Sequence, residues 1–274
     1  MAGSRADGAQ VPPIARLERF TQVASTQEVV RAWLAEGQAE ICLAIADQQT
    51  AGRGRLGRRW LAPPGCALLV SAGFRPLDLP LAQAWRLPAV TAMAMLDAAT
   101  ALLSPGAERL ALKWPNDIVT VRQGRLRKVG GVLAETEADG ERLVSAVVGL
   151  GVNVDWPATA FPPQLAATMG SLREAGHGPV DREILLSSWL ARLAPLYGQL
   201  LAGHFDGRRW ADAQVTTAAD VTVETGSSRL QGRAVGVDIE SGALLVLEPA
   251  SGEVRSVGVG EVVACIVGGS AWPL

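Results

Sequence analysis

The chain of 274 residues has little cysteine, histidine or tyrosine: three, two and one residue, respectively. Cys42, Cys66 and Cys265 lie far apart and form no C-x-x-C pair. This argues against a disulfide framework or structural zinc site and fits a reducing cytoplasm. His177 and His204 lie in polar, glycine-containing stretches without an H-E-x-x-H motif or a hydrolase triad. We therefore assign neither histidine a catalytic role.

Long apolar runs are also missing, so we expect no transmembrane helix and no membrane partner. The N-terminal segment lacks the apolar core of a signal peptide, and we expect residues 1–13 to form a flexible tail. Neither sign of charge dominates, because the formal net charge is -2 and the pI about 5.8. A hydrophobic share of 49% with 19% charged residues is typical of a globular protein.

Hydrophobic periodicity predicts an α+β protein in which helices cover a mixed β-sheet. A capping-box sequence at 25–28 predicts the start of a first helix. Two further helices are expected over 82–103 and 181–203, the last interrupted at Pro195. A loop is expected over 155–180. The expected strands of this region are 14–24, 41–46, 66–74, 109–113, 117–121, 129–137 and 142–150.

Beyond residue 212 the sequence changes character. Five short apolar runs alternate there with glycine-containing turns. This pattern predicts a small all-β barrel or sandwich. We therefore divide the chain into a tail (1–13), a large domain (14–212) and a small β domain (213–274).

The stretch 52-GRGRLGRRW-60 has four arginines and three glycines in eight residues, followed by Trp60. One interpretation is a solvated basic loop or a weak nucleic-acid patch. The other is an anion-binding loop that closes over a phosphate-bearing ligand. Glycines allow the backbone to approach a ligand closely, and arginines offer forked donors that match phosphate and carboxylate oxygens.

The segment 113-KWPND-117 follows a predicted strand. Pro115 makes it a stiff corner, because it fixes its own φ and restricts Trp114. The corner presents Lys113, Asn116 and Asp117 together. Asn116 and Asp117 carry oxygen ligands of the kind that Mg²⁺ takes beside substrate phosphates. The alternative is that Asn-Asp forms only a turn.

Two glycine patterns lie in predicted strands. Lys128 enters a strand just before Gly130 and Gly131, where a ligand could approach closely and an ammonium could reach an anionic oxygen. The alternative is an edge-strand lysine beside a bulge. Gly149 and Gly151 are two residues apart, so they share one strand face and open a slot for a flat apolar ligand.

Together these parts suit the activation of a carboxylic acid by ATP. Attack of a carboxylate on the α-phosphorus gathers several negative oxygens, which lysine, arginine and Mg²⁺ neutralise. The arginine loop, Lys113, Lys128 and the Asn116-Asp117 pair supply such groups, and the glycine slot would seat the apolar body of the acid.

In their order and spacing the motifs resemble those of biotin protein ligases, also called biotin–[acetyl-CoA-carboxylase] ligases. The resemblance runs from about residue 25 to 153. It rests on Ser25-Thr26, 47-DQQTAGRGRLGRRW-60, 113-KWPND-117, 128-KVGGVLAE-135 and 149-GLGVN-153.

This resemblance implies an enzyme that couples biotin to ATP, forming biotinyl-5′-adenylate and pyrophosphate with Mg²⁺. It then transfers biotin to one lysine of a biotin carboxyl carrier domain, of acetyl-CoA carboxylase or a related carboxylase. The implied fold is a class II synthetase-like catalytic domain with a mixed β-sheet and helices, followed by a small C-terminal SH3-like β-barrel. The implied location is cytoplasmic.

The resemblance also implies roles for individual residues. The catalytic residues would be Arg55, Lys113, Lys128 and Asp117, and a metal would bind Asn116 and Asp117. ATP and the adenylate would contact Arg53, Arg55, Arg58, Trp60, Lys113, Asn116 and Asn153. Biotin would contact Ser25, Thr26, Gln27, Gln49, Gly52, Arg53, Gly54, Arg55, Lys128, Gly131, Gly149 and Gly151.

Two positions depart from the family pattern: Gln27 stands where asparagine is frequent, and Leu56 where a polar or basic residue is common. We expect Leu56 to be tolerated. The residues before Ser25 are too few for the winged helix-turn-helix domain of some relatives, so we expect no DNA-binding role.

Two other functions are weighed. A lipoate or octanoate ligase or transferase would use a similar fold, but the GRGRxGR and KWPND combination is of the biotin type. A non-catalytic nucleic-acid binder would show a broad basic surface, and this chain is slightly acidic. The sequence leaves open whether the protein is a monomer or a homodimer.

Overall fold

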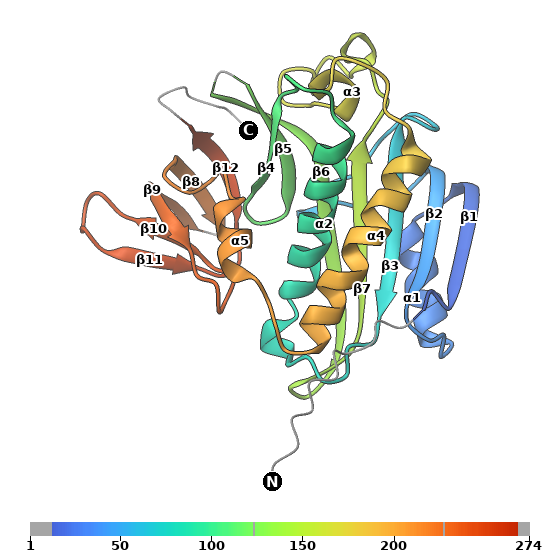
Figure 1. Cartoon of the computed structure of the whole chain (residues 1–274). Helices are drawn as coiled ribbons and strands as arrows, with labels where there is room; N and C mark the ends of the chain where they lie inside the picture. Colours follow the sequence, from blue (N-terminus) through green and yellow to red (C-terminus); the bar gives the residue numbers. More distant parts are fainter. Residues whose placement is uncertain (1–12, 123, 227, 268–274) are drawn as a thin grey trace.

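The computed structural model describes residues 13–122, 124–226 and 228–267. A seven-stranded mixed sheet forms the larger part, in the order β1-β2-β3-β7-β6-β5-β4 (Figure 1). β1 pairs parallel with β2, and the other neighbours are antiparallel. The strands are β1 (Arg16–Val23), β2 (Cys42–Gln49), β3 (Ala67–Phe74), β4 (Arg109–Lys113), β5 (Asp117–Arg122), β6 (Arg125–Asp139) and β7 (Arg142–Asn153).

Helices cover both faces of this sheet. α1 (Thr26–Ala35) packs through Val30, Trp33 and Leu34 on one face. The long helices α2 (Arg86–Leu102) and α4 (Arg182–Leu201) pack together on the other face (Figure 1). Strand alternation produces this division: even-numbered residues of β7 from 148 to 152 join the main core. The odd-numbered glycines at 149 and 151 therefore face the α1 side.

A second sheet follows the short helix α5 (Gly207–Asp212). It has five antiparallel strands in the order β11-β10-β9-β8-β12. Within the described ranges no pairing joins β11 to β12. The prediction of a β-sheet in this segment is confirmed for the described residues, but the sheet is open, so the expected SH3-like barrel is not confirmed. Its strands are β8 (Asp220–Thr225), β9 (Ser228–Val237), β10 (Leu244–Leu247), β11 (Val254–Val257) and β12 (Glu261–Ile266).

The predicted mixed sheet with helices is confirmed, but several local details differ. Ser25 is the N-cap of α1, yet its side chain makes no capping hydrogen bond, so the predicted capping box is not formed. α4 continues through the exposed Pro195 instead of being interrupted. The expected loop at 155–180 contains a helical turn, α3 (Leu172–Ala175). β6 and β7 extend beyond their predicted ends.

The sequence analysis predicted neither disulfide bonds nor a membrane-spanning helix. The three cysteines are free, and Cys42 and Cys265 are buried. Within the part of the chain that the structure describes, no helix combines the length and apolar character needed to cross a membrane. The predicted tail lies almost entirely outside the described residues.

Candidate active site

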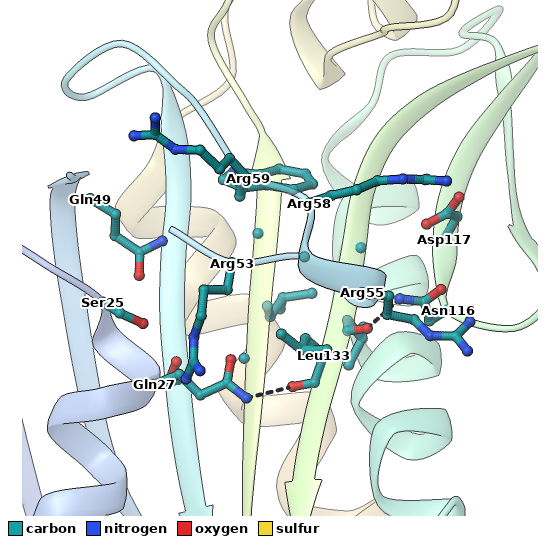
Figure 2. A pocket seen from close by; sticks show the side chains of 18 of the residues that line it. Ser25, Gln27, Gln49, Arg53, Arg55, Arg58, Arg59, Asn116, Asp117 and Leu133 are labelled. Atoms are coloured by element: carbon teal, nitrogen blue, oxygen red, sulfur yellow. Dashed lines mark hydrogen bonds between the residues drawn. The ribbon is translucent and has the colours of Figure 1, made fainter. Parts of the chain in front are cut away.

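One pocket on the α1 side of the large sheet collects most of the residues singled out in the sequence (Figure 2). Its floor is formed by β6 and β7, and the arginine loop crosses its mouth. The predicted residues that line it are Ser25, Thr26, Gln27, Gln49, Arg53, Gly54, Arg55, Arg58, Trp60, Lys113, Asn116, Asp117, Lys128, Gly131, Gly149 and Gly151.

Strand register explains why three distant motifs meet on the floor. Asp117 pairs with Gly131 across β5 and β6, and Gly131 pairs with Gly151 across β6 and β7. These three residues therefore form one row across the sheet. At both glycines the missing side chain leaves room for another group. A Cβ atom at Gly131 would lie 3.3 Å from Lys128 Nζ, and one at Gly151 would lie 2.7 Å from Trp60 Cε2.

Neutral polar groups gather at the end of the pocket near α1. The backbone N–H of Thr26 donates to Gln49 Oε1 at 2.8 Å, and the Thr26 hydroxyl lies 2.8 Å from Ser71 Oγ. Gln27 is 4% exposed, and its amide donates to the Leu133 carbonyl at 3.4 Å. This end offers donors and acceptors for a neutral polar ligand group.

The arginine loop folds back on itself. Gly54 N–H donates to the Arg58 carbonyl at 2.7 Å, and Trp60 N–H donates to the Gly52 carbonyl at 2.9 Å. The turn places Leu56 at φ 55° and Gly57 at φ 73°. A left-handed conformation suits glycine and strains leucine. The Leu56 side chain is 73% exposed, so its identity does not shape the pocket.

Charged groups gather at the opposite end, around Asp117 (Figure 2). Lys128 Nζ lies 2.6 Å from one carboxylate oxygen of Asp117, and Lys113 Nζ lies 3.6 Å from the other. Lys113 also donates to the Val262 carbonyl of β12 at 3.0 Å. Asn116 is fixed by a 2.6 Å hydrogen bond from its amide to the Val132 carbonyl. One carboxylate thus positions two ammonium groups.

Burial and charge act in opposite directions on these groups. Burial raises the pKa of Asp117, but Lys128 and Lys113 outweigh it and hold that pKa below its usual value. Burial lowers the pKa of Lys113, and the neighbouring Asp117 carboxylate partly opposes this. The pKa of Arg55 is also lowered, chiefly by burial.

The pocket as a whole is strongly basic. The charged groups that line it are Arg53, Arg55, Arg58, Arg59, Lys113 and Lys128, against Asp117 and Glu261. Six basic and two acidic side chains form this lining in a chain whose net charge is only -2. Such a field suits a ligand with several negative oxygens.

Comparison with known proteins agrees with this chemistry. Residues 20–153 match the biotin/lipoate A/B protein ligase family. The biotin–[acetyl-CoA-carboxylase] ligase of Paracoccus denitrificans is 34% identical over 227 residues, which cover 81% of this chain and 90% of that protein. The chain belongs to the biotin protein ligase family.

Other relatives of this ligase extend the comparison. The bifunctional ligase/repressor BirA of Bacillus subtilis is 28% identical over 225 residues, covering 81% of this chain and 67% of that protein. The structure of the Aquifex aeolicus biotin protein ligase in complex with biotin and ATP is similar with a TM-score of 0.72 and 26% identity. The matched region covers 90% of this chain and 97% of the Aquifex aeolicus chain.

Two residues that the resemblance assigned to ligands lie outside the pocket lining. Gly52 is the first residue of the loop, and a Cβ atom there would lie 2.5 Å from the Trp60 carbonyl oxygen. It therefore serves the packing of the loop. Asn153 is buried, and its amide donates to the Gly170 carbonyl at 2.9 Å. Its contact with the adenylate stays a prediction.

Several residues that line the pocket were given no role in the sequence analysis, among them Ser71, Arg59, Leu133 and Glu261. Ser71 could have been found, because it is a lone hydroxyl in an otherwise apolar strand. Arg59 lies in the arginine loop but was given no role. Leu133 lies on β6 between two residues that face the main core, so strand alternation places it on the pocket side. Glu261 comes from β12, more than a hundred residues after the last motif, and no local pattern marks it.

The donor set does not fit a magnesium ion bound directly to Asp117. Each of its two carboxylate oxygens faces an ammonium group, of Lys128 and of Lys113. A divalent cation would have to displace both lysines and would be repelled by them. Among the described residues, no cluster of three or more histidine, cysteine or acidic side chains could hold a metal. The metal site expected at Asn116 and Asp117 therefore has little physical support.

Proposed function

We propose that this protein is an ATP-dependent biotin protein ligase that works through an acyl-adenylate. In the first step a carboxylate oxygen of biotin bonds to the α-phosphorus of ATP. The bond from that phosphorus to the bridging β-oxygen breaks, and pyrophosphate leaves. In the second step a lysine amine of a carrier domain attacks the acyl carbon, AMP leaves, and the amine loses a proton.

The observation that supports this function best is the separation of two chemistries along one pocket. Neutral hydrogen-bonding groups occupy the end near α1, and Lys113, Lys128 and Arg55 lie at the end near Asp117. Biotin has the matching polarity, with a neutral ureido ring at one end and a carboxylate at the other. The glycine row on β6 and β7 leaves room for the connecting apolar chain.

The proposed roles follow from position. Ser25, Thr26, Gln27 and Gln49 hold the ureido ring. Arg55, Lys113 and Lys128 neutralise the carboxylate and phosphate oxygens, and Arg53, Arg58 and Trp60 close over the adenylate. Positioning and charge neutralisation account for most of the rate in such a reaction.

Asp117 acts in this proposal as the anchor of the two lysines. Its lowered pKa keeps it ionised, and it also makes the carboxylate a weak proton acceptor. We therefore assign it positioning of Lys113 and Lys128 instead of deprotonation of the acceptor lysine. No magnesium-dependent step is assigned to it.

We also propose the division into a catalytic unit at 14–212 and a C-terminal unit at 213–274, with an SH3-like arrangement of the latter. The partner is a biotin carboxyl carrier domain, as the biotin–[acetyl-CoA-carboxylase] ligase activity requires. A cytoplasmic location follows from the need for ATP and for a carrier protein.

Pyrophosphate release tests the proposal. Purified protein is supplied with MgATP and either biotin, lipoate or octanoate, and the carrier domain is added afterwards. Release with biotin, followed by a biotin-sized mass increase on one carrier lysine, is the expected result. Release with lipoate or octanoate alone would keep acid activation and replace the substrate. Release with none of the acids would overturn the proposal.

A further inference from the structure

A second pocket lies on the opposite face of the large sheet from the candidate active-site pocket, which is called the first pocket below. Ala134 of β6 lines the second pocket, whereas the neighbouring Leu133 lines the first, because successive residues of a strand point to opposite faces. Ala89 and Ala92 of α2 also line it, and α2 covers the face opposite α1. The C-terminal sheet closes the other side through the turn that contains Gly242.

Three tryptophans give the second pocket aromatic walls. Trp85 is the N-cap of α2, Trp114 follows β4, and Trp210 lies on α5. The centroids of the Trp85 and Trp210 rings are 5.0 Å apart. The indole N–H of Trp114 donates to the Gly242 carbonyl at 3.0 Å. The indole N–H of Trp85 donates to the Glu240 carbonyl at 3.3 Å. Because the backbone takes up these two N–H groups, the two rings offer the pocket apolar surface.

A buried amide, that of Gln214, faces the second pocket. Gln214 is 5% exposed, and its Oε1 accepts no hydrogen bond from the described residues. Backbone bonds fix its place beside β4, since Leu112 N–H donates to the Ala213 carbonyl at 2.9 Å and Val215 N–H donates to the Leu112 carbonyl at 2.8 Å. A buried amide oxygen without a donor is unfavourable, and such groups in folded proteins normally meet one. In this pocket the donor must come from a bound molecule, either water or a ligand.

We propose that the second pocket binds a small, planar, uncharged molecule whose N–H group donates to Gln214 Oε1. Indole rings and alanine methyl groups suit a flat apolar body, because offset and edge contacts between rings add to simple burial. A carboxamide suits a neutral partner that has a donor beside an acceptor, as the N–H and the ring nitrogen of an azole do. Water fits less well, since a buried water needs two to four polar partners and the rings around it supply few.

The two pockets meet at the corner that follows β4. Lys113, Asn116 and Asp117 line both of them. A molecule beside Trp114 therefore lies next to the groups that hold the carboxylate and phosphate oxygens in the proposed reaction, but it reaches them from the other face of the sheet. The chemistry of the two pockets differs, because cations dominate the first and aromatic rings the second. Binding in the second pocket requires neither biotin nor ATP, so it does not depend on the proposed function.

The indole N–H resonances of isotope-labelled tryptophan locate a bound probe. Benzimidazole is the probe, because it is flat and has an N–H donor beside an acceptor nitrogen. We expect saturable shifts of the Trp85 and Trp114 signals, assigned with single Trp→Phe variants, while Trp33 on the α1 face stays unchanged. N-methylbenzimidazole has the same ring without the donor. It should bind about five- to tenfold more weakly, the loss that corresponds to one hydrogen bond.

Gln214→Leu tests the part played by the amide. The change removes the acceptor and keeps an apolar side chain in its place, so the variant should bind both probes equally well. Gln231→Leu is the matched control, since Gln231 is an exposed residue of β9, and it should keep the preference for benzimidazole. A thermal unfolding scan shows whether each variant is folded, and the comparison of the two probes in wild type needs no variant. Absence of saturable shifts at Trp85 and Trp114, or an equal affinity of wild type for both probes, would overturn the proposal.

A second titration asks whether the two pockets are separate sites. Biotinyl-5′-adenylate is added to saturation, which the signal of Trp60 in the first pocket reports, and benzimidazole is then titrated. We expect benzimidazole still to shift the Trp85 signal. If the adenylate abolishes that shift, the second pocket belongs to the nucleotide site, and a separate ligand is wrong. If the adenylate does not bind while benzimidazole still shifts Trp85, the proposed function fails and the second pocket stands.

Discussion

The indole ring of Trp60 lies over Gly151 and occupies the space that a side chain would need there. A Cβ atom at residue 151 would come within 2.7 Å of Trp60 Cε2 and 3.0 Å of Cζ2. The ring also lies below Lys128, whose Nζ is 5.8 Å from its centroid. Trp60 thus joins the end of the arginine loop to the floor of the pocket, and loop closure depends on residue 151 being glycine.

Gly151→Ala should therefore weaken ligand binding more than it weakens the fold. The added methyl group forces the Trp60 ring away, and a loop residue can move at small cost. We expect about tenfold weaker binding of biotinyl-5′-adenylate, in line with an overpacking penalty of ~1–3 kcal/mol. Isothermal titration with the adenylate and urea unfolding measure the two effects. Gly178→Ala is the control, because nothing lies within 4 Å of a Cβ atom there. Equal binding by Gly151→Ala and wild type would contradict the dependence.

Arg55→Ala should shorten retention of the adenylate and leave the fold intact. We propose that Arg55 forms a charge-assisted hydrogen bond with the ligand, and such a bond contributes ~1.5–3 kcal/mol. The residue lies in a surface loop where it is only partly buried and belongs to neither sheet, so the free energy of unfolding should change by less than ~0.5 kcal/mol. Release of preformed adenylate from the enzyme, followed after dilution, gives its half-life. Exposed Arg229→Ala is the matched control. A lower unfolding temperature with an unchanged half-life would show that Arg55 is structural.

The strands and the pocket could largely be predicted because their signals are local. Alternating hydrophobicity located the strands, and the glycines at 131, 149 and 151 marked the floor. Glu261 could not be predicted in this way, since its place depends on how β12 packs beside Lys113. The same reason explains Pro195: packing of α4 against α2 keeps the helix continuous where local preference favours a break.

Lys128→Ala should weaken biotin binding. Its ammonium lies 2.6 Å from Asp117 yet remains 40% exposed toward the pocket, so it can pair with a ligand carboxylate. Loss of that contact costs about 1.5–3 kcal/mol, or roughly ten- to 150-fold in the dissociation constant. Equilibrium binding of biotin without ATP measures it. Arg125→Ala, an exposed change at the start of the same strand, is the control. An unchanged dissociation constant for Lys128→Ala would remove Lys128 from the biotin site.

Asp117→Asn should destabilise the protein in a pH-dependent way. The change leaves Lys113, whose side chain is 5% exposed, without its counter-charge, and breaking a buried pair costs ~3–5 kcal/mol. The pKa of Asp117 is lowered in the folded protein, chiefly because Lys128 and Lys113 outweigh the effect of burial. Its contribution is therefore fully present above the unfolded pKa of about 3.9 and is lost as the pH falls through the lower folded value.

Urea unfolding of wild type and Asp117→Asn at pH 7, and at several values below pH 4, tests this sign. The stability difference between the two proteins should be largest at neutral pH and shrink as acid protonates Asp117 in the wild type. Asp139→Asn, at the exposed end of β6, should show no such difference at any pH. A difference that is the same in acid as at pH 7 would mean that the asparagine disturbs packing, and that the carboxylate charge does not hold the two lysines.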